Sequence, residues 1–230
     1  MLPMRRSFTQ SDPLRLGVLI SGGGTTLANL IERRADGRLR NCDIKLVISS
    51  RSEVRGVEIA RRAELPLEII RKRDFPELSE FSDAIVAALD TARVDLVVMA
   101  GFLCLWRIPG RYQGRVLNIH PALLPSFGGH GMYGHHVHEA VLAAGEAESG
   151  CSVHLADNQY DHGPIIAQTR VPVRADDTPD SLTERVGGAE RELYPRVIQA
   201  VAEHGLAWLS RRVDVPGELP PPAIVPEEAD

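Results

Sequence analysis

The sequence predicts a single α/β domain with a mostly parallel sheet flanked by helices and an antiparallel C-terminal portion. In the first half, short runs that are apolar throughout alternate with segments whose apolar residues recur at helical spacing. This alternation is typical of a parallel sheet covered on both faces. In the second half, Cys151–Ala156 alternates apolar and polar residues, which indicates a half-exposed strand next to Ile165–Val173.

The elements of the domain follow in chain order. A leader over 1–13 precedes the domain at 14–210, and a Pro- and Glu-rich tail follows over 211–230. Besides the two strands named above, we expect strands at Leu14–Ile20, Ile44–Ser49, Leu67–Ile70, Val94–Ala100 and Arg115–Ile119. We expect helices at Thr26–Arg34, Val54–Ala63, Leu78–Leu89, Val137–Ala144 and 179–205.

Composition excludes several classes of protein. The chain has 230 residues, of which 43% are hydrophobic and 25% charged, so it can bury a full core and is not mainly disordered. Its net charge of −5 gives no basic bias, and we expect no nucleic acid partner. No apolar run approaches the roughly 18 residues of a membrane span, and no secretory signal follows Met1. Three cysteines, odd in number and far apart, favour the cytoplasm.

A glycine-rich turn follows the first predicted strand. Ser21–Thr26 (SGGGTT) leads directly into a helix. Glycines let successive N–H groups point at one ligand, and the helix N-terminus adds partial positive charge, so Gly24, Thr25 and Thr26 suit a phosphate. The alternative is a tight turn with a Thr cap. A dinucleotide fingerprint fails because Leu27 stands where the third Gly belongs, and no Lys completes a P-loop.

A second polar group lies at the end of a later strand. Asn118 and His120 are two residues apart, so both side chains lie on one side of that strand, above the crevice where α/β sheets bind ligands. An amide and an imidazole can bind a carbonyl oxygen and stabilise its oxyanion. Asp161 could pair with His120 and raise its pKa, or act only as an Asx-turn residue. Ser152 and His154 alternate on a neighbouring strand, and His154 could equally be an ordinary sheet residue.

Two further features carry weaker interpretations. Four histidines (His130, His135, His136, His138) lie in and after the loop Ser126–Gly134. The loop is glycine-rich and poor in other ligands, so we expect it to cover a substrate rather than hold a metal. Cys104 lies in an apolar run and is expected to form a cleft wall or core, not a nucleophile.

These segments, in this order, resemble the folate-dependent phosphoribosylglycinamide formyltransferases of the formyltransferase family. The resemblance covers about residues 14–210, and its most specific part is Asn-Ile-His-Pro followed some forty residues later by Asp-x-Gly-Pro. The matching segments are ISGGGTTL (20–27), VDLVVMAGF (94–102), VLNIHPALLPSF (116–127), HVHEAVL (136–142), GCSVHLADNQYDHGPII (150–166) and ERVGGAERELYP (184–195).

The resemblance implies a Rossmann-like fold and transfer of the formyl group of 10-formyltetrahydrofolate, a co-substrate, to the amine of 5'-phosphoribosylglycinamide in purine biosynthesis. Asn118, His120 and Asp161 match the catalytic trio, with His120 as general acid, Asn118 on the formyl oxygen and Asp161 keeping His120 charged. No metal is implied, and the chain would act as a monomer or homodimer. Further matches are Gly24, Thr25 and Thr26 for the substrate phosphate; Gly187 and Glu190 for its ribose and glycinamide; and Leu103, Cys104, Leu105, Trp106, Asn118, Asp157, Asn158, Gln159 and Tyr160 for the folate.

The chain departs from the pattern in three places. Gly23–Thr26 stands where relatives commonly have Asn-Gly-Ser-Asn, and Phe127–Gly134 is longer than usual. An arginine common near Leu78 is absent, so Arg71, Lys72 or Arg73 would hold the glutamate tail of the folate.

Several rival functions stay open. Formyltetrahydrofolate deformylase usually has an extra N-terminal domain, methionyl-tRNA formyltransferase an extra C-terminal one, and sugar-nucleotide formyltransferases a longer chain. A dinucleotide-binding oxidoreductase and an inactive binding protein are the rivals from outside the family's chemistry.

Overall fold

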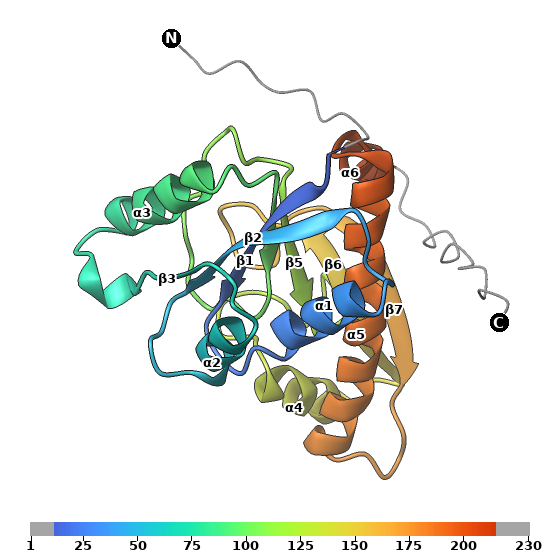
Figure 1. The fold of residues 1–230 in the computed structure, drawn as a ribbon. Helices are drawn as coiled ribbons and strands as arrows, with labels where there is room; N and C mark the ends of the chain where they lie inside the picture. The colour runs from blue at the N-terminus through green and yellow to red at the C-terminus, as the bar shows by residue number, and fades with distance from the viewer. Residues whose placement is uncertain (1–11, 215–230) are drawn as a thin grey trace, which may run out of the picture.

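The computed structural model describes residues 12–214, with side chains as far as residue 212. In this part, seven strands form one sheet in the order β3-β2-β1-β4-β5-β6-β7 (Figure 1). Pairing is parallel from β3 to β5 and antiparallel in β5-β6 and β6-β7. This confirms the predicted fold class. The strands are β1 Leu14–Ile20, β2 Cys42–Ser49, β3 Leu67–Ile69, β4 Leu96–Met99, β5 Val116–His120, β6 Glu148–Leu155 and β7 Ile165–Pro172.

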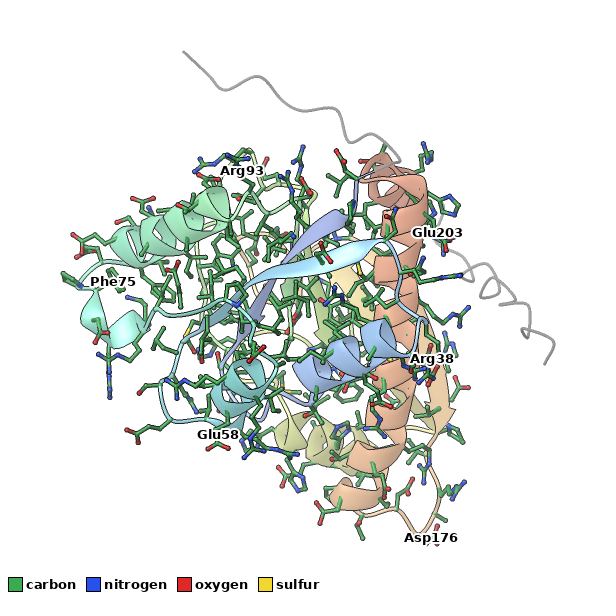
Figure 2. All side chains as sticks on the ribbon, viewed as in Figure 1. Arg38, Glu58, Phe75, Arg93, Asp176 and Glu203 are labelled. Carbon is green, nitrogen blue, oxygen red and sulfur yellow. The ribbon has the colours of Figure 1, made fainter. Side chains whose placement is uncertain are left out.

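Helices cover both faces of the sheet, so β1, β2, β4 and β5 are mostly buried on both sides, whereas the edge strand β3 is partly exposed. Alternate residues of β1 enter opposite cores: Val18 packs in the core beneath α1 and α5, and Leu19 in the core beneath α3. Figure 2 shows charged residues such as Glu58 and Arg93 at the periphery, away from these cores. The helices are α1 Thr25–Ala35, α2 Arg55–Arg62, α3 Leu78–Thr91, α4 His135–Ala143, α5 Pro179–His204 and α6 Ala207–Asp214, with a 3₁₀ turn η1 at Lys72–Asp74.

The prediction that the strand at Cys151–Ala156 is half-exposed is wrong. Strand β6 begins earlier, at Glu148, and every residue from Ser149 to Leu155 is buried. The alternation of polar residues predicted that Ser152 and His154 face water. Both are instead buried and hydrogen-bonded inside the protein. A polar side chain in a strand indicates a solvent-exposed position only where the fold provides no buried hydrogen-bond partner for it.

Helix α5 is one continuous helix of 26 residues although Pro195 lies inside it. Proline has no N–H to donate to the carbonyl four residues earlier, which here belongs to Arg191. Asn29 of α1 takes that place, since its Nδ2 donates to the Arg191 carbonyl at 2.9 Å. The buried Tyr194 hydroxyl lies 3.1 Å from the Met99 carbonyl and 2.9 Å from the Leu117 carbonyl, so α5 is joined to β4 and β5.

The predicted domain boundary at residue 210 falls inside α6, which continues to Asp214. Arg211 and Arg212 therefore belong to this last helix rather than to the tail. The periodic pattern is short here, and only the packing of Trp208 and Leu209 into the core beneath α5 identifies it as a helix of the domain. The remaining part of the predicted tail, 215–230, and nearly all of the leader lie outside the described residues.

Candidate active site

A cleft of about 680 Å³ opens at the carboxyl ends of β1, β4 and β5. Parallel strands end at the same edge of a sheet, which is where open α/β sheets bind ligands. The glycine-rich turn after β1, the loop after β4 and the Asn-Ile-His run of β5 therefore meet there. Predicted site residues on the cleft wall are Thr25, Thr26, Leu103, Cys104, Leu105, Trp106, Asn118, His120, Asp157, Gln159, Tyr160, Asp161, Gly187 and Glu190.

Two predicted site residues do not line this cleft. Gly24 is buried behind the turn, and Asn158 faces the neighbouring loop, where its Oδ1 accepts a hydrogen bond from the Ile108 N–H at 2.8 Å. Asn158 thus joins the loop before Asp161 to the loop after β4. Its contribution in this structure is to fix the separation of two walls.

Asn118, His120 and Asp161 converge at the base of the cleft. The Asn118 Nδ2 donates to Asp161 Oδ1 at 3.3 Å and lies 3.0 Å from His154 Nε2. The His120 Nδ1 lies 3.4 Å from Asp161 Oδ2. Strand β6 supplies His154 because its register places this residue directly opposite Asn118. The structure thus brings the predicted trio together and adds His154 to it.

The surroundings of His120 fix the state of its two ring nitrogens. Its Nε2 lies 2.7 Å from the Phe127 carbonyl, which can only accept, so Nε2 carries a hydrogen. Proton gain and loss therefore occur at Nδ1, beside Asp161. Burial lowers the pKa of His120, outweighing the opposite effects of Asp161 and the Phe127 carbonyl. This direction opposes the expected effect of Asp161 on His120, and the charged state of His120 during the reaction stays a prediction.

Asp161 is held as a carboxylate. Burial acts to raise its pKa, but contacts with His154, His120 and the Gly129 N–H outweigh burial and lower it. The Gly129 N–H donates to Asp161 Oδ2 at 3.1 Å. The Asx-turn alternative applies to Asp157 instead, whose Oδ1 accepts from the Gln159 N–H at 2.8 Å.

The loop that supplies the Phe127 carbonyl is held from β6. The buried Ser152 hydroxyl donates to the Ala122 carbonyl at 2.6 Å and accepts from the Leu124 N–H at 3.0 Å. Gln168 Nε2 donates to the same hydroxyl at 2.8 Å. Ser152 therefore positions the loop and does not line the cleft, whereas its predicted companion His154 does.

The glycine-rich turn is tight because two backbones approach closely. Gly24 has φ +70°, and a Cβ built on it would lie 2.5 Å from the Gly56 Cα at the start of α2. Gly24 is also the N-cap of α1, and it has no side chain with which to cap the helix. The alternative of a Thr cap is thus wrong: Thr25 and Thr26 belong to the first turn of α1 and line the cleft, and the helix N-terminus has no side-chain cap.

Glu190 and Gly187 face the cleft from the middle of α5. Burial raises the pKa of the Glu190 carboxyl from 4.5 to about 7. Near neutral pH it therefore both accepts and donates hydrogen bonds, which suits hydroxyl and amine groups of a ligand.

Of the four histidines in and after the glycine-rich loop Ser126–Gly134, two line the cleft and two lie on the surface. His130 and His138 line the cleft, whereas His135 and His136 are exposed and lie near Glu139. Among residues 12–214, no three His, Cys, Asp or Glu side chains are arranged to hold a metal ion. The three cysteines are free; Cys104 is on the cleft wall, as predicted, and burial raises the pKa of Cys42 to about 11 and of Cys151 to about 12.

A model of the formyl transferase family matches residues 14–198 of the chain. The chain belongs to the formyl transferase family. The similarity expected from the motifs is thus confirmed, and the trio described above lies within the matched segment. No helix of the described part of this formyl transferase is long and apolar enough to cross a membrane.

Named relatives are similar across most of the chain. Phosphoribosylglycinamide formyltransferase, chloroplastic, of Arabidopsis thaliana is 38% identical over 84% of this chain and 67% of its own length. The Drosophila melanogaster trifunctional purine biosynthetic protein adenosine-3 is 40% identical over 86% of this chain, which spans only 14% of that longer protein.

Solved structures are similar to this formyl transferase in fold. Glycinamide ribonucleotide transformylase 1 of Symbiobacterium toebii has a TM-score of 0.78 at 36% identity, covering 87% of this chain and 92% of that one. Phosphoribosylglycinamide formyltransferase of Coxiella burnetii has a TM-score of 0.75 at 37% identity, covering 84% of this chain and 89% of that one.

Proposed function

We propose that the chain transfers the formyl group of 10-formyltetrahydrofolate to the amine of 5'-phosphoribosylglycinamide, a step of purine biosynthesis. The observation that carries this proposal is the convergence of Asn118, His120 and Asp161 at the base of one large cleft. The Arabidopsis relative and the Symbiobacterium and Coxiella structures, all named for this activity, support it.

The chemistry begins when the amine nitrogen attacks the formyl carbon. The formyl oxygen gains negative charge, and the Asn118 amide stabilises that oxyanion, joined by His120 once its Nδ1 carries a proton. The amine must lose a proton, and the Asp161 carboxylate with the neutral Nδ1 of His120 can accept it. The developing oxyanion favours the charged imidazole. His120 then returns the proton to the departing folate nitrogen as its bond to the formyl carbon breaks.

The remaining roles are assigned by position. Thr25 and Thr26 hold the acceptor phosphate with the first turn of α1, and Gly24 gives that turn its shape. Gly187 and Glu190 contact the ribose and glycinamide. Leu103 to Trp106 and the loop Asp157 to Tyr160 bind the folate, with Asn158 keeping these two loops in place. No resident metal or nucleotide takes part.

The odd number and wide spacing of the three cysteines support a cytoplasmic protein. We place the enzyme in the cytoplasm as a monomer or homodimer, without a nucleic acid or membrane partner; the Arabidopsis relative, by contrast, is named as chloroplastic.

The experiment is formyl transfer itself. Protein is mixed with phosphoribosylglycinamide and a 10-formyl folate, and release of the deformylated folate is followed by absorbance, with and without the amine. Release that requires the amine supports the proposal. Release without the amine would identify a deformylase, and no release in either mixture would contradict both functions.

A further inference from the structure

The cleft contains one side chain with a permanent positive charge. Arg191 is the only Lys or Arg on the described cleft wall. A phosphate monoester carries nearly two negative charges at neutral pH, and a guanidinium such as that of the exposed Arg191 binds it with charge-assisted hydrogen bonds. The glycine-rich turn contributes only hydroxyls and backbone N–H groups.

We propose that Arg191 binds the phosphate of the acceptor substrate and makes this enzyme select a phosphorylated amine. This inference rests on the proposed function and adds to it the residue that supplies the charge. It places a substrate contact on α5, one turn after Gly187, at a position that the motif comparison did not assign.

Two consecutive glycines make room for the Arg191 side chain. Helical side chains lean toward the N-terminus, so a residue on α5 covers the turn before it. A Cβ built on Gly187 would lie 3.4 Å from Arg191 Nη1, and one built on Gly188 would lie 3.9 Å from Nη2. The guanidinium therefore lies over the surface that a side chain at residue 187 would occupy, along the cleft wall.

Asn29 brings Arg191 close to the glycine-rich turn. Because Pro195 leaves the Arg191 carbonyl without its helical donor, the Asn29 amide binds it at 2.9 Å. Asn29 also lines the cleft and lies one turn after Thr25 and Thr26 on the same face of α1. The uncapped N-terminus of α1, the two threonine hydroxyls and the guanidinium thus border one region of the cleft.

The guanidinium of Arg191 is available for a ligand. It forms no ion pair with any described residue, whereas its neighbour Glu192 is paired with Arg33. The adjacent cleft carboxyl, Glu190, is partly protonated near neutral pH because burial raises its pKa to about 7, although Arg191 acts to lower it. Glu184, the other glutamate on the wall, is exposed to water. An incoming phosphate therefore displaces no salt bridge from Arg191.

The test compares acceptors with and without the phosphate. Arg191→Gln and Arg191→Lys are assayed with phosphoribosylglycinamide and with the dephosphorylated riboside, and Arg62→Gln on exposed α2 is the matched loss of charge outside the cleft. We expect Arg191→Gln to raise KM for the phosphorylated acceptor about tenfold to a hundredfold. Its kcat/KM for the riboside and its KM for the formyl folate should stay within about twofold of wild type. Arg191→Lys should recover part of the loss, and Arg62→Gln should show none.

Equal losses with both acceptors, or no loss with the phosphorylated one, would overturn the proposal. A binding measurement separates its failure from failure of the proposed function. Ribose 5-phosphate is expected to raise the Tm of the wild type and of Arg62→Gln, and to have a much smaller effect on Arg191→Gln. This result supports Arg191 even if the wild type transfers no formyl group, whereas equal Tm shifts in the three proteins, or no shift in the wild type, would refute it.

Discussion

Two buried serines on strand β6 differ in what their hydroxyls contact. Ser152 makes three hydrogen bonds, with the Ala122 carbonyl, the Leu124 N–H and Gln168 Nε2. Ser149 is equally buried, but its hydroxyl has no partner among the described residues. Removing a hydroxyl that leaves buried partners unsatisfied costs about 1–3 kcal/mol for each such group, whereas removing an unpartnered hydroxyl costs little. Gln168 keeps its second bond, to the Leu124 carbonyl.

Ser152→Ala should therefore lower the free energy of unfolding by about 2–4 kcal/mol, while Ser149→Ala should leave it unchanged or raise it by up to about 1 kcal/mol. Urea denaturation at pH 7, followed by circular dichroism, measures both. Because Ser152 holds the loop that bears the Phe127 carbonyl, its kcat should also fall at a temperature where the variant is folded. Equal changes in unfolding free energy for the two variants would show that these hydrogen bonds do not stabilise the loop.

Three other changes test the site and the fold. Asp161→Asn should lower kcat by about 10²–10⁴-fold without lowering the Tm by more than a few degrees, and near-wild-type turnover would defeat the mechanism. Glu190, with its pKa raised by burial from 4.5 to about 7, binds its proton more tightly in the folded state. The stabilisation of the fold by protonated Glu190 is complete below pH 4.5 and is lost as pH rises through 7. The free energy of unfolding should therefore fall by about 3 kcal/mol over this range in the wild type and much less in Glu190→Gln. Urea denaturation at several pH values measures this, and equal pH dependence in the two proteins would contradict it. Gly24→Ala should lower the free energy of unfolding by about 2–4 kcal/mol, more than Gly37→Ala does. Both glycines have positive φ, but of the two only Gly24 lies against another backbone segment. Equal losses of Tm in the two variants would show that the close approach to Gly56 does not destabilise the variant.

The sequence was sufficient to predict the sheet and the convergence of the trio. Apolar runs such as Leu14–Ile20 are buried on both faces, and in β5 the period of two places Asn118 and His120 on one side. Asp161 follows from the motif match rather than from periodicity, since nothing local relates residues 120 and 161. The start and the exposure of β6 could not be predicted, because long-range packing buries Ser149 before the predicted strand and Ser152 within it.

The pKa of His120 and the ring nitrogen that exchanges its proton also could not be predicted from the sequence. A neighbouring carboxylate raises an imidazole pKa, but how far burial opposes it depends on the whole wall around the ring. The Phe127 carbonyl, which decides which nitrogen exchanges a proton, is a backbone atom of a loop that no side-chain pattern identifies. The role proposed for Arg191 was not predicted either, although a glycine pair three and four residues before an arginine in a predicted helix is a signal that could be sought.

Tyr194 and Pro195 are adjacent residues of α5, and both carry bonds out of the helix: the Tyr194 hydroxyl to β4 and β5, and the carbonyl that Pro195 frees to Asn29 of α1. Sliding α5 along its axis, or turning it, would break all of these contacts together. The cleft wall that α5 provides is therefore fixed to β5, the strand that carries Asn118 and His120. These two adjacent residues thus set where Gly187 and Glu190 of α5 lie relative to Asn118 and His120 of β5.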